Sequence, residues 1–285
     1  MPQPIKQIKN RIRSVESTKK VTAAMQMVSV AKLNRIEEDL FALRIYASRL
    51  ENLMHNLTGL SGELVSEYFK KQPDNSDIAL CLITSDSGLC GVYNQNVIHT
   101  AEEFLKKNGT ERVKLILVGR KGLSYFRSKP VKILNSYIGL NAKFTQDSCD
   151  TITAELVRLF LSGQVGSVYL AYTYFKNSLF QKATVQRFLS IEAREVKPVE
   201  YIIEPDLESL LTDLIPRYLA VKMHLVFLEA FTSEHAARII SMKTATDNAK
   251  ELLEGLVLLR NKVRQAGITQ DILEITSSVE ALRGR

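Results

Sequence analysis

Two long helical patterns frame this chain, one at each end of the sequence. Near the C-terminus the apolar residues recur at alternating steps of three and four positions, the heptad pattern of a helix that packs along another helix. The first set is Met242, Ala245, Ala249, Leu252, Leu256, Leu259, Val263 and Ala266, and a second set on a rotated face is Ile268, Ile272, Ile275, Val279 and Leu282. The pattern predicts one helix over 206–282, which would be about 110 Å long at 1.5 Å per residue and needs a partner along its length.

The partner is predicted at the N-terminus, where residues 3–57 have the pattern of a single helix. One heptad register runs through Ile5, Ile8, Ile12 and Val15, and again through Leu33, Ile36, Leu40, Leu43, Ala47, Leu50, Met54 and Leu57. Between these sets the seam positions are polar, and the apolar residues stand off the seam. The polar positions are Lys19, Thr22, Gln26 and Ser29, and the displaced apolar residues are Val21, Ala24, Met25, Val28 and Ala31. We therefore expect this helix to meet another surface as well as its partner helix.

Between the two helices the hydrophobic period changes to that of buried strands. Strands are predicted over 78–83, 113–118, 131–138, 167–174 and 181–189, with helices over 94–107, 120–127 and 145–161. This order predicts a Rossmann-like α/β domain with helices on both faces of its sheet. The fold class is then α/β, with a long antiparallel coiled coil of the N- and C-terminal helices and an inserted α/β domain.

Three segments follow from this division of the chain: an N-terminal coiled-coil helix over 1–60, an α/β domain over 61–205 and a C-terminal coiled-coil helix over 206–285. Residues 207–232 are apolar nearly all round, so we expect them to pack against the α/β domain. The antiparallel pairing leads us to expect Ala47 opposite residues 240–250. A linker is predicted over 195–204.

Charge makes the N-terminal helix the place to look for a partner. The 285 residues carry a net charge of +7, and the excess of basic residues is concentrated in 1–32. That stretch holds Lys6, Lys9, Arg11, Arg13, Lys19, Lys20 and Lys32 against Glu16 alone. Such a stretch favours an acidic surface, which could be nucleic acid, lipid headgroups or an acidic protein, unless it is only a solvated helix face. Residues 1–32 contain no aromatic side chain to stack on a base, which weighs against a nucleic-acid-binding protein.

The candidate chemistry in the sequence is sparse. The turn Gly88-Leu89-Cys90-Gly91 follows a predicted strand, where an α/β fold can hold a phosphate, but it is not a G-x-G-x-x-G motif and Asp86 would repel a phosphate. The four histidines do not pair at helical spacing, and the three cysteines are scattered. We expect no catalytic residue, no cofactor and no metal site. A small α/β enzyme that uses the turn over 86–91 remains an alternative.

Several stretches together resemble one family, the gamma subunit of the rotary F-type ATP synthase. At the N-terminus they are IKNRIRSV from Ile8 and TKKVTAAMQMV from Thr18, and at the first strand they are TSD from Thr84 and GLCG from Gly88. At the C-terminus they are SEHAAR from Ser233, MKTATDNA from Met242, NKVRQA from Asn261 and ITQDILEI from Ile268. The chain departs from the family at Asp271, where Glu is usual, and at Ser278-Val279, where Gly-Ala is usual.

The resemblance implies a central rotor shaft that couples ion flow through the membrane c ring to ATP synthesis in the alpha/beta hexamer. The chain would be non-catalytic, bound to the alpha, beta and epsilon subunits and the c ring but not to nucleic acid. It would be a peripheral membrane protein on the cytoplasmic face of a bacterial inner membrane. By the match, Lys19, Lys20, Met25, Arg264 and Gln265 would contact beta. An apolar upper bearing would hold Ile268, Ile272, Ile275, Val279 and Leu282.

Overall fold

The computed structural model describes residues 5–60, 67–69, 76–140, 146–191 and 206–283, and the side chains of 58–60 and 280–283 lie outside the description. The chain divides into two compact units. Unit 1 combines Met1–Val28 with Ile239–Arg285, and unit 2 is Ser29–Arg238. The predicted linker over 195–204 and the predicted domain boundaries at 61 and 205 lie outside the described residues, so that division stays a prediction.

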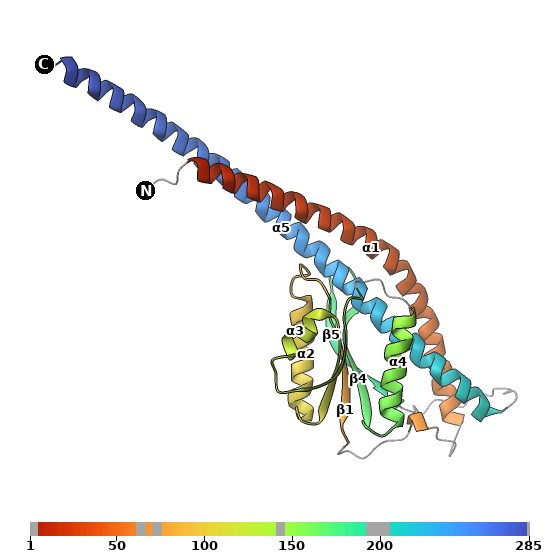
Figure 1. Ribbon diagram of the computed structural model, residues 1–285. Coiled ribbons are helices and arrows are strands. Elements are labelled where there is room, and N and C mark those ends of the chain that lie inside the picture. Colours follow the sequence, from red (N-terminus) through yellow and green to blue (C-terminus); the bar gives the residue numbers. More distant parts are fainter. Residues whose placement is uncertain (1–4, 61–66, 70–75, 141–145, 192–205, 284–285) are drawn as a thin grey trace. The chain divides into compact units, whose positions relative to one another are not determined.

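Two helices of unusual length confirm the predicted frame. Helix α1 (Ile5–Leu60) has 56 residues and helix α5 (Leu207–Arg283) has 77 residues (Figure 1). The seam predicted on α1 is confirmed, because its members are buried or half-buried, including the polar positions. On α5 the seam is partly different: Leu252 and Leu259 are each 43 % exposed, whereas Leu253 packs into the helix pair. An alternation of three and four does not say which of two adjacent leucines faces the partner.

The sheet of unit 2 has five strands in the order β3-β2-β1-β4-β5. The strands are β1 (Ile78–Ile83), β2 (Val113–Val118), β3 (Lys132–Tyr137), β4 (Ser167–Phe175) and β5 (Gln181–Leu189). Strands β1 to β4 pair in parallel, and β5 returns antiparallel to β4 as the predicted hairpin. Every residue of β1 is buried, as expected for the central strand of a sheet covered on both faces.

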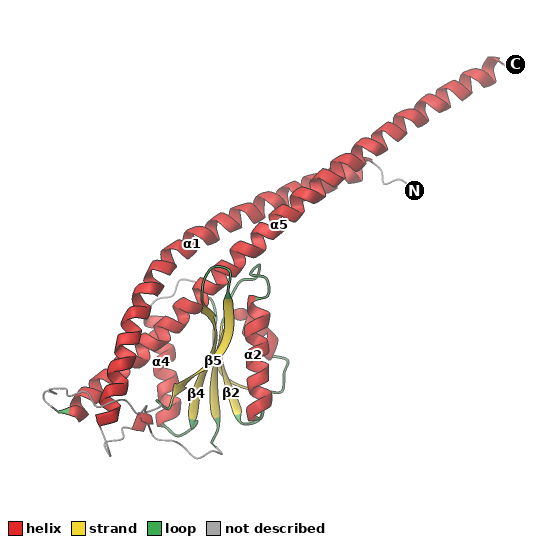
Figure 2. Ribbon diagram, turned by 180° about the vertical axis from the view of Figure 1, so that it is seen from behind, coloured by secondary structure: helices red, strands yellow, loops and turns green. Residues whose placement is uncertain are grey.

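Helices cover both faces of this sheet, as predicted (Figure 2). Helices α2 (Tyr93–Asn108) and α3 (Arg120–Phe126) form one layer, and Ile78, Leu80 and Leu82 of β1 pack in the core beneath it. Helix α4 (Gln146–Leu161) lies on the other face with the second half of α1 and the first part of α5. A short 3-10 helix, η1 (Glu67–Phe69), packs at the edge of this second core.

The first part of α5 is a core element of unit 2. Leu211, Ile215, Leu219, Met223 and Phe227 are each no more than 3 % exposed and belong to the same core as α4 and β4. This burial confirms the expectation drawn from the apolar stretch over 207–232. Burying five such side chains contributes roughly 10 kcal/mol in gross terms, before the entropy of ordering them is counted.

The expected position of Ala47 is wrong. Ala47 lines a cavity together with Val221 and Leu225, well before residues 240–250 on α5. The direction of pairing was right, because the second half of α1 does face the first part of α5 within unit 2. The register could not be derived from the heptads alone, because successive heptads present equivalent seams.

Candidate functional site

The first site to consider is the antiparallel helix pair of unit 1. Ile8 and Ile12 of α1 are buried against Leu256 of α5, and Val15, Leu253 and Val263 pack around them. Farther along, Thr22 of α1 meets Thr246 of α5. Position numbers rise on one helix as they fall on the other, so the two helices run in opposite directions. Figure 1 shows α5 continuing past the first turn of α1.

The seam becomes polar in its middle. The hydroxyls of Thr22 and Thr246 share a hydrogen bond of 2.7 Å. Each hydroxyl also lies within hydrogen-bond distance of a carbonyl of its own helix, Lys19 O at 3.0 Å and Met242 O at 2.8 Å. Because a hydroxyl has one proton, one of the two donates across the pair and the other donates to the carbonyl of its own helix. Thr22 of α1 is buried, and on α5 the buried positions on either side of Thr246 are Met242 and Ala249. Small and polar side chains give this stretch of the seam less apolar burial than a leucine seam would.

Apolar side chains on this stretch of α1 face outward instead. Val21, Met27 and Val28 are 55 %, 72 % and 56 % exposed. The exposed position of Val21 and Val28 follows from the sequence pattern, because the seam is occupied by Thr22 and its neighbours. Met25 and Lys19 are half-buried and Lys20 is exposed. This face can therefore meet a further surface, as expected from the sequence.

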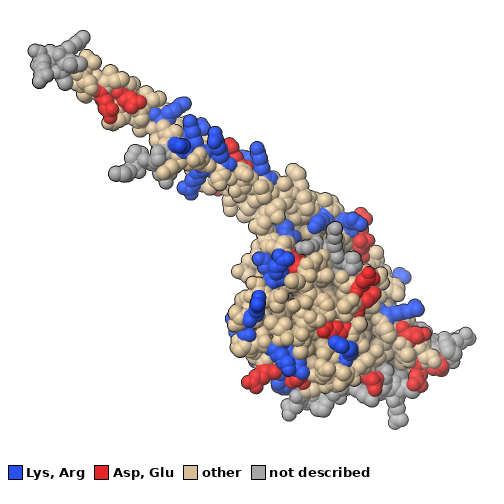
Figure 3. Space-filling view, viewed as in Figure 1, with Lys and Arg blue, Asp and Glu red and all other residues tan. Residues whose placement is uncertain are grey.

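Basic side chains gather on the same unit. Lys6, Lys9, Arg11, Arg13 and Lys20 are exposed, and Figure 3 shows Lys and Arg side chains clustered along the helix pair. None of these five has an ion-pair partner within the ranges that the structure describes. A surface of this kind attracts acidic groups over about 8–10 Å at moderate salt.

The end of α5 is exposed on every side. Arg264 and Gln265 are exposed, and so is each described side chain from Ile268 to Val279. The apolar members are Ile268 at 51 %, Ile272 at 57 %, Ile275 at 65 % and Val279 at 44 %. Leu282 belongs to α5, but its side chain lies outside the described residues. A run of large exposed apolar side chains on one helix end is typical of a segment that another protein covers.

A second candidate site is the turn after β1 in unit 2, where an enzyme would hold a phosphate. One carboxylate oxygen of Asp86 accepts hydrogen bonds of 3.0 Å from the backbone N–H groups of Arg120 and Gly139. These N–H groups mark the ends of β2 and β3, so Asp86 ties three strand ends together. Gly119 permits the approach, since its φ is +93° and a Cβ there would lie 2.1 Å from the carbonyl oxygen of Thr84. The carboxylate of Asp86 therefore occupies the backbone N–H groups that a phosphate would otherwise use in this turn.

Arg238 of α5 closes the same turn. Its guanidinium donates to the carbonyl of Gly88 at 3.3 Å, to the hydroxyl of Ser87 at 3.1 Å and to the carboxylate of Glu234 at 2.5 Å. Burial raises the pKa of Glu234, and the charge of Arg238 opposes that rise. The neighbouring His235 accepts from Arg238 through Nδ1 at 3.2 Å. Its pKa is lowered to about 4 by burial and by the positive charges of Arg238 and Lys32.

The remaining groups of the turn are also engaged. Asn94 hydrogen-bonds Ser85 and the thiol of Cys90, and burial raises the pKa of that thiol, which keeps it protonated and unreactive. No group of three His, Cys, Asp or Glu side chains that could hold a metal ion occurs among the described residues. In the same ranges, no helix is both long enough and apolar enough to cross a membrane.

Two buried charges escaped sequence analysis. Glu229 of α5 accepts 2.8 Å and 2.7 Å hydrogen bonds from Arg44 Nε and the backbone N–H of Phe175, and Arg238 reaches back to the turn after β1. The signal for Glu229 was present, since it is the one carboxylate between Leu214 and Thr232 in the apolar stretch of α5. The contact of Arg238 with the turn had no local signal, because Ser87 and Gly88 lie about 150 positions away in sequence.

Comparisons with known proteins agree over nearly the whole chain. A family model described as ATP synthase matches residues 4–282. An ATP synthase gamma chain of Anaeromyxobacter sp. (strain Fw109-5) is 37% identical, with 98% of this chain and 99% of the relative covered. An ATP synthase gamma chain of Solibacter usitatus is 38% identical over 96% of this chain and 97% of its own length.

Solved structures show the same fold. One is the Euglena gracilis mitochondrial ATP synthase, OSCP/F1/c-ring, of which one chain matches with a TM-score of 0.66 at 16% identity, covering 98% of this chain and 94% of the other. Another is the central stalk/c-ring of the Tetrahymena thermophila mitochondrial ATP synthase. One of its chains matches with a TM-score of 0.59 at 23% identity, covering 79% of this chain and 99% of the other. None of these matches supports the nucleic-acid-binding alternative.

Proposed function

The chain belongs to the family of ATP synthase gamma chains, and from this premise we propose that it is the central rotor shaft of an F-type ATP synthase. In this role it couples ion flow through the membrane c ring to ATP synthesis in the alpha/beta hexamer. The observation that carries the proposal is the antiparallel helix pair of unit 1, whose sides differ. One side of α1 exposes Val21 and Val28, and the seam beside it is polar.

Unequal sides are what a shaft needs in order to act on equal subunits. Three chemically identical beta subunits around an asymmetric rod make three different contacts. A contact that is stronger in one beta conformation shifts that subunit toward this conformation and changes its affinity for nucleotide. Turning the rod then passes each beta subunit through the same series of affinities.

The proposed contacts with beta lie on both helices. Lys20 offers an exposed ammonium to an acidic lever of beta, with Lys19 and Met25 half-buried beside it. Arg264 and Gln265 offer exposed polar groups to a loop of beta. Ile268, Ile272, Ile275, Val279 and Leu282 would enter an apolar upper bearing, and the exposure of the first four supports this assignment.

The chain itself would perform no catalysis. The turn after β1, where an α/β enzyme would bind a phosphate, is filled by Asp86 and Arg238. Catalysis would take place in beta, with the epsilon subunit and the c ring as partners of the α/β domain. The assembled complex would hold the chain on the cytoplasmic face of a bacterial inner membrane.

Co-expression with alpha and beta subunits tests the proposal. We expect ATPase-active hexamers that form or turn over only when this chain is present. The charge-reversing variant Lys20→Glu should lower the hydrolysis rate, because it places two acidic groups against each other. The matched variant Lys182→Glu, at an exposed position of β5, should leave the rate unchanged. Full activity without the chain would refute the proposal.

A further inference from the structure

A polar cavity of about 190 Å³ lies in unit 2, where the second half of α1, the first part of α5 and the end of β5 meet. The groups that matter in its lining are Glu51, His55, Arg187, Ser190, Tyr218 and Lys222. The rotor role makes no use of this cavity. Its lining is rich in hydrogen-bond donors, which is unusual for a gap that is left only by imperfect packing.

The two strong cations of the lining are held in place by the fold. The ammonium of Lys222 donates to the carbonyl of Arg187 at 3.1 Å and to the hydroxyl of Tyr218 at 3.4 Å. The guanidinium of Arg187 donates to the hydroxyl of Ser190 at 3.1 Å and lies 6.0 Å from the ring centre of Tyr169. Cations positioned in this way lose little conformational entropy when an anion binds between them.

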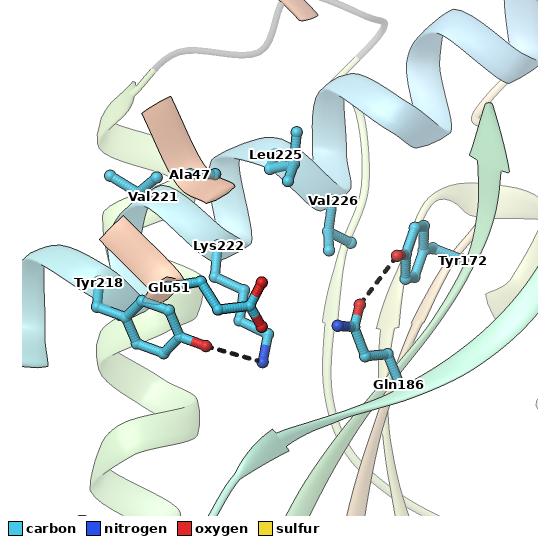
Figure 4. A pocket seen from close by; sticks show the side chains of 9 residues that line it. All are labelled: Ala47, Glu51, Tyr172, Gln186, Tyr218, Val221, Lys222, Leu225 and Val226. Carbon is cyan, nitrogen blue, oxygen red and sulfur yellow. Dashed lines mark hydrogen bonds between the residues drawn. The ribbon is translucent and has the colours of Figure 1, made fainter. Parts of the chain in front are cut away.

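One carboxylate opposes them. Figure 4 shows the carboxylate of Glu51 and the ammonium of Lys222 pointing into the same space. The side chain of Glu51 is 44% exposed, so water screens its charge, and its nearer partner in the lining is His55 at 3.8 Å. Lys222 and Arg187 are both half-buried, where a charge acts more strongly than at the surface. The cavity is therefore positive on balance.

A smaller cavity of about 60 Å³ adjoins the first one and shares Glu51, Tyr218 and Lys222 with it. Its wall adds the apolar side chains of Val221, Leu225 and Val226. The combined space has a cationic end and an apolar end. A ligand that fits it carries a compact anion with room for a small apolar extension.

We propose that this cavity binds a phosphate group, held by Lys222 and Arg187 with the hydroxyls of Ser190 and Tyr218 around it. A tetrahedral oxyanion accepts hydrogen bonds from several directions, which suits donors that come from α5 and β5 at once. The phosphate is either free inorganic phosphate or the terminal phosphate of a nucleotide. Bound there, it links α5 to β5 and stabilises unit 2 by mass action.

Isothermal titration calorimetry of the full chain tests the site, with inorganic phosphate and ATP as separate probes at low ionic strength. We expect one saturable site, weakened roughly tenfold or more by Lys222→Met, which removes a charge-assisted hydrogen bond. Glu51→Gln should tighten binding, because it removes the opposing charge at a half-exposed position. Lys182→Met, on the exposed side of β5, should not change the affinity.

The two phosphate sources separate in a competition experiment. If ATP displaces inorganic phosphate from the wild-type chain but has no such effect on the Lys222→Met variant, the site takes a nucleotide phosphate. If ATP does not compete with inorganic phosphate for the wild-type chain, the site takes the free ion. Absence of saturable binding up to about 20 mM phosphate, which detects dissociation constants as weak as about that concentration, would overturn the proposal. Equal affinity in the wild type, Lys222→Met and Glu51→Gln would overturn it as well.

Discussion

Glu229 and Arg44 form the most enclosed ion pair between helices that the structure describes in unit 2. Arg44 donates to Glu229 at 2.8 Å and also to the carbonyl of Phe175, and its guanidinium lies over the rings of Phe41 and Tyr174. Burial raises the pKa of Glu229, while the N–H of Phe175 and Arg44 oppose the rise. A carboxylate held in this way depends on its cation, because an unpaired charge in the core is costly.

Removing the cation should therefore destabilise unit 2. We expect Arg44→Met to lower the free energy of unfolding by about 3 kcal/mol at neutral pH. The loss should shrink as the pH falls, since protonation of Glu229 removes the unpaired charge. Denaturant unfolding followed by circular dichroism measures the change. Arg49→Met, at an exposed position of the same helix, is the control and should cost less than about 0.5 kcal/mol; equal effects of the two variants would refute this role of the pair.

His235 should make stability depend on pH. Its pKa is about 4 in the folded chain against a usual 6.5, so its neutral form is favoured by folding. Its contribution is complete above pH 6.5 and is lost as the pH falls toward 4. From pH 7 to pH 5 this group alone should cost about 2 kcal/mol. His235→Gln should flatten that part of the profile measured by denaturant unfolding, and an unchanged slope between pH 7 and pH 5 would contradict the assignment.

At the level of elements, the sequence predicted α1 and the strands closely. The seam of α1 was found in full because its register never slips, even where Thr22 and Ser29 replace apolar residues. Strands β1, β2 and β5 have the predicted bounds. Leu252 and Leu259 were wrongly assigned to the seam of α5, and the register between α1 and α5 was wrong at Ala47. Periodicity defines one helix face, but only side-chain packing between the helices selects the register.

The candidate sites were less predictable than the fold. Exposure of Ile268 and Ile272 agrees with a helix end that needs a partner, yet the contacts with beta stay predictions. The closure of the turn after β1 by Arg238 could not be derived, because it depends on the three-dimensional approach of α5 to β1. Asp86 was expected to repel a phosphate there, and the structure shows its carboxylate bound to the backbone N–H groups of Arg120 and Gly139.

A disulfide trap tests the register of the helix pair in unit 1. The hydroxyls of Thr22 and Thr246 are 2.7 Å apart, so the double variant Thr22→Cys with Thr246→Cys should form a disulfide under mild oxidation. Thr22→Cys with Lys250→Cys should not, because one further turn of helix adds about 5–6 Å. Native cysteines at 81, 90 and 149 are buried and should not interfere. Gel mobility without reductant reports the result, and crosslinking of the second pair alone would show a different register.

At the scale of the whole molecule, the polar middle of the α1 seam has a mechanical meaning under the rotor proposal. Weak apolar packing leaves this part of the pair able to change its contacts as it turns past successive beta subunits. Replacing Lys19, Thr22, Gln26 and Ser29 by leucines should strengthen the pair and slow ATP turnover in reconstituted hexamers. Turnover and rotation rates equal to those of the wild type would show that the polar seam has no such role.

Single-molecule rotation tests the rotor proposal most directly. The full chain would carry one bead through Lys182→Cys, an exposed position of β5, in alpha/beta hexamers fixed to glass through beta. With ATP supplied, the proposal predicts continuous rotation in one direction with three pauses per turn, one for each beta subunit. A bead that only fluctuates about a fixed angle while the same hexamers hydrolyse ATP would contradict it.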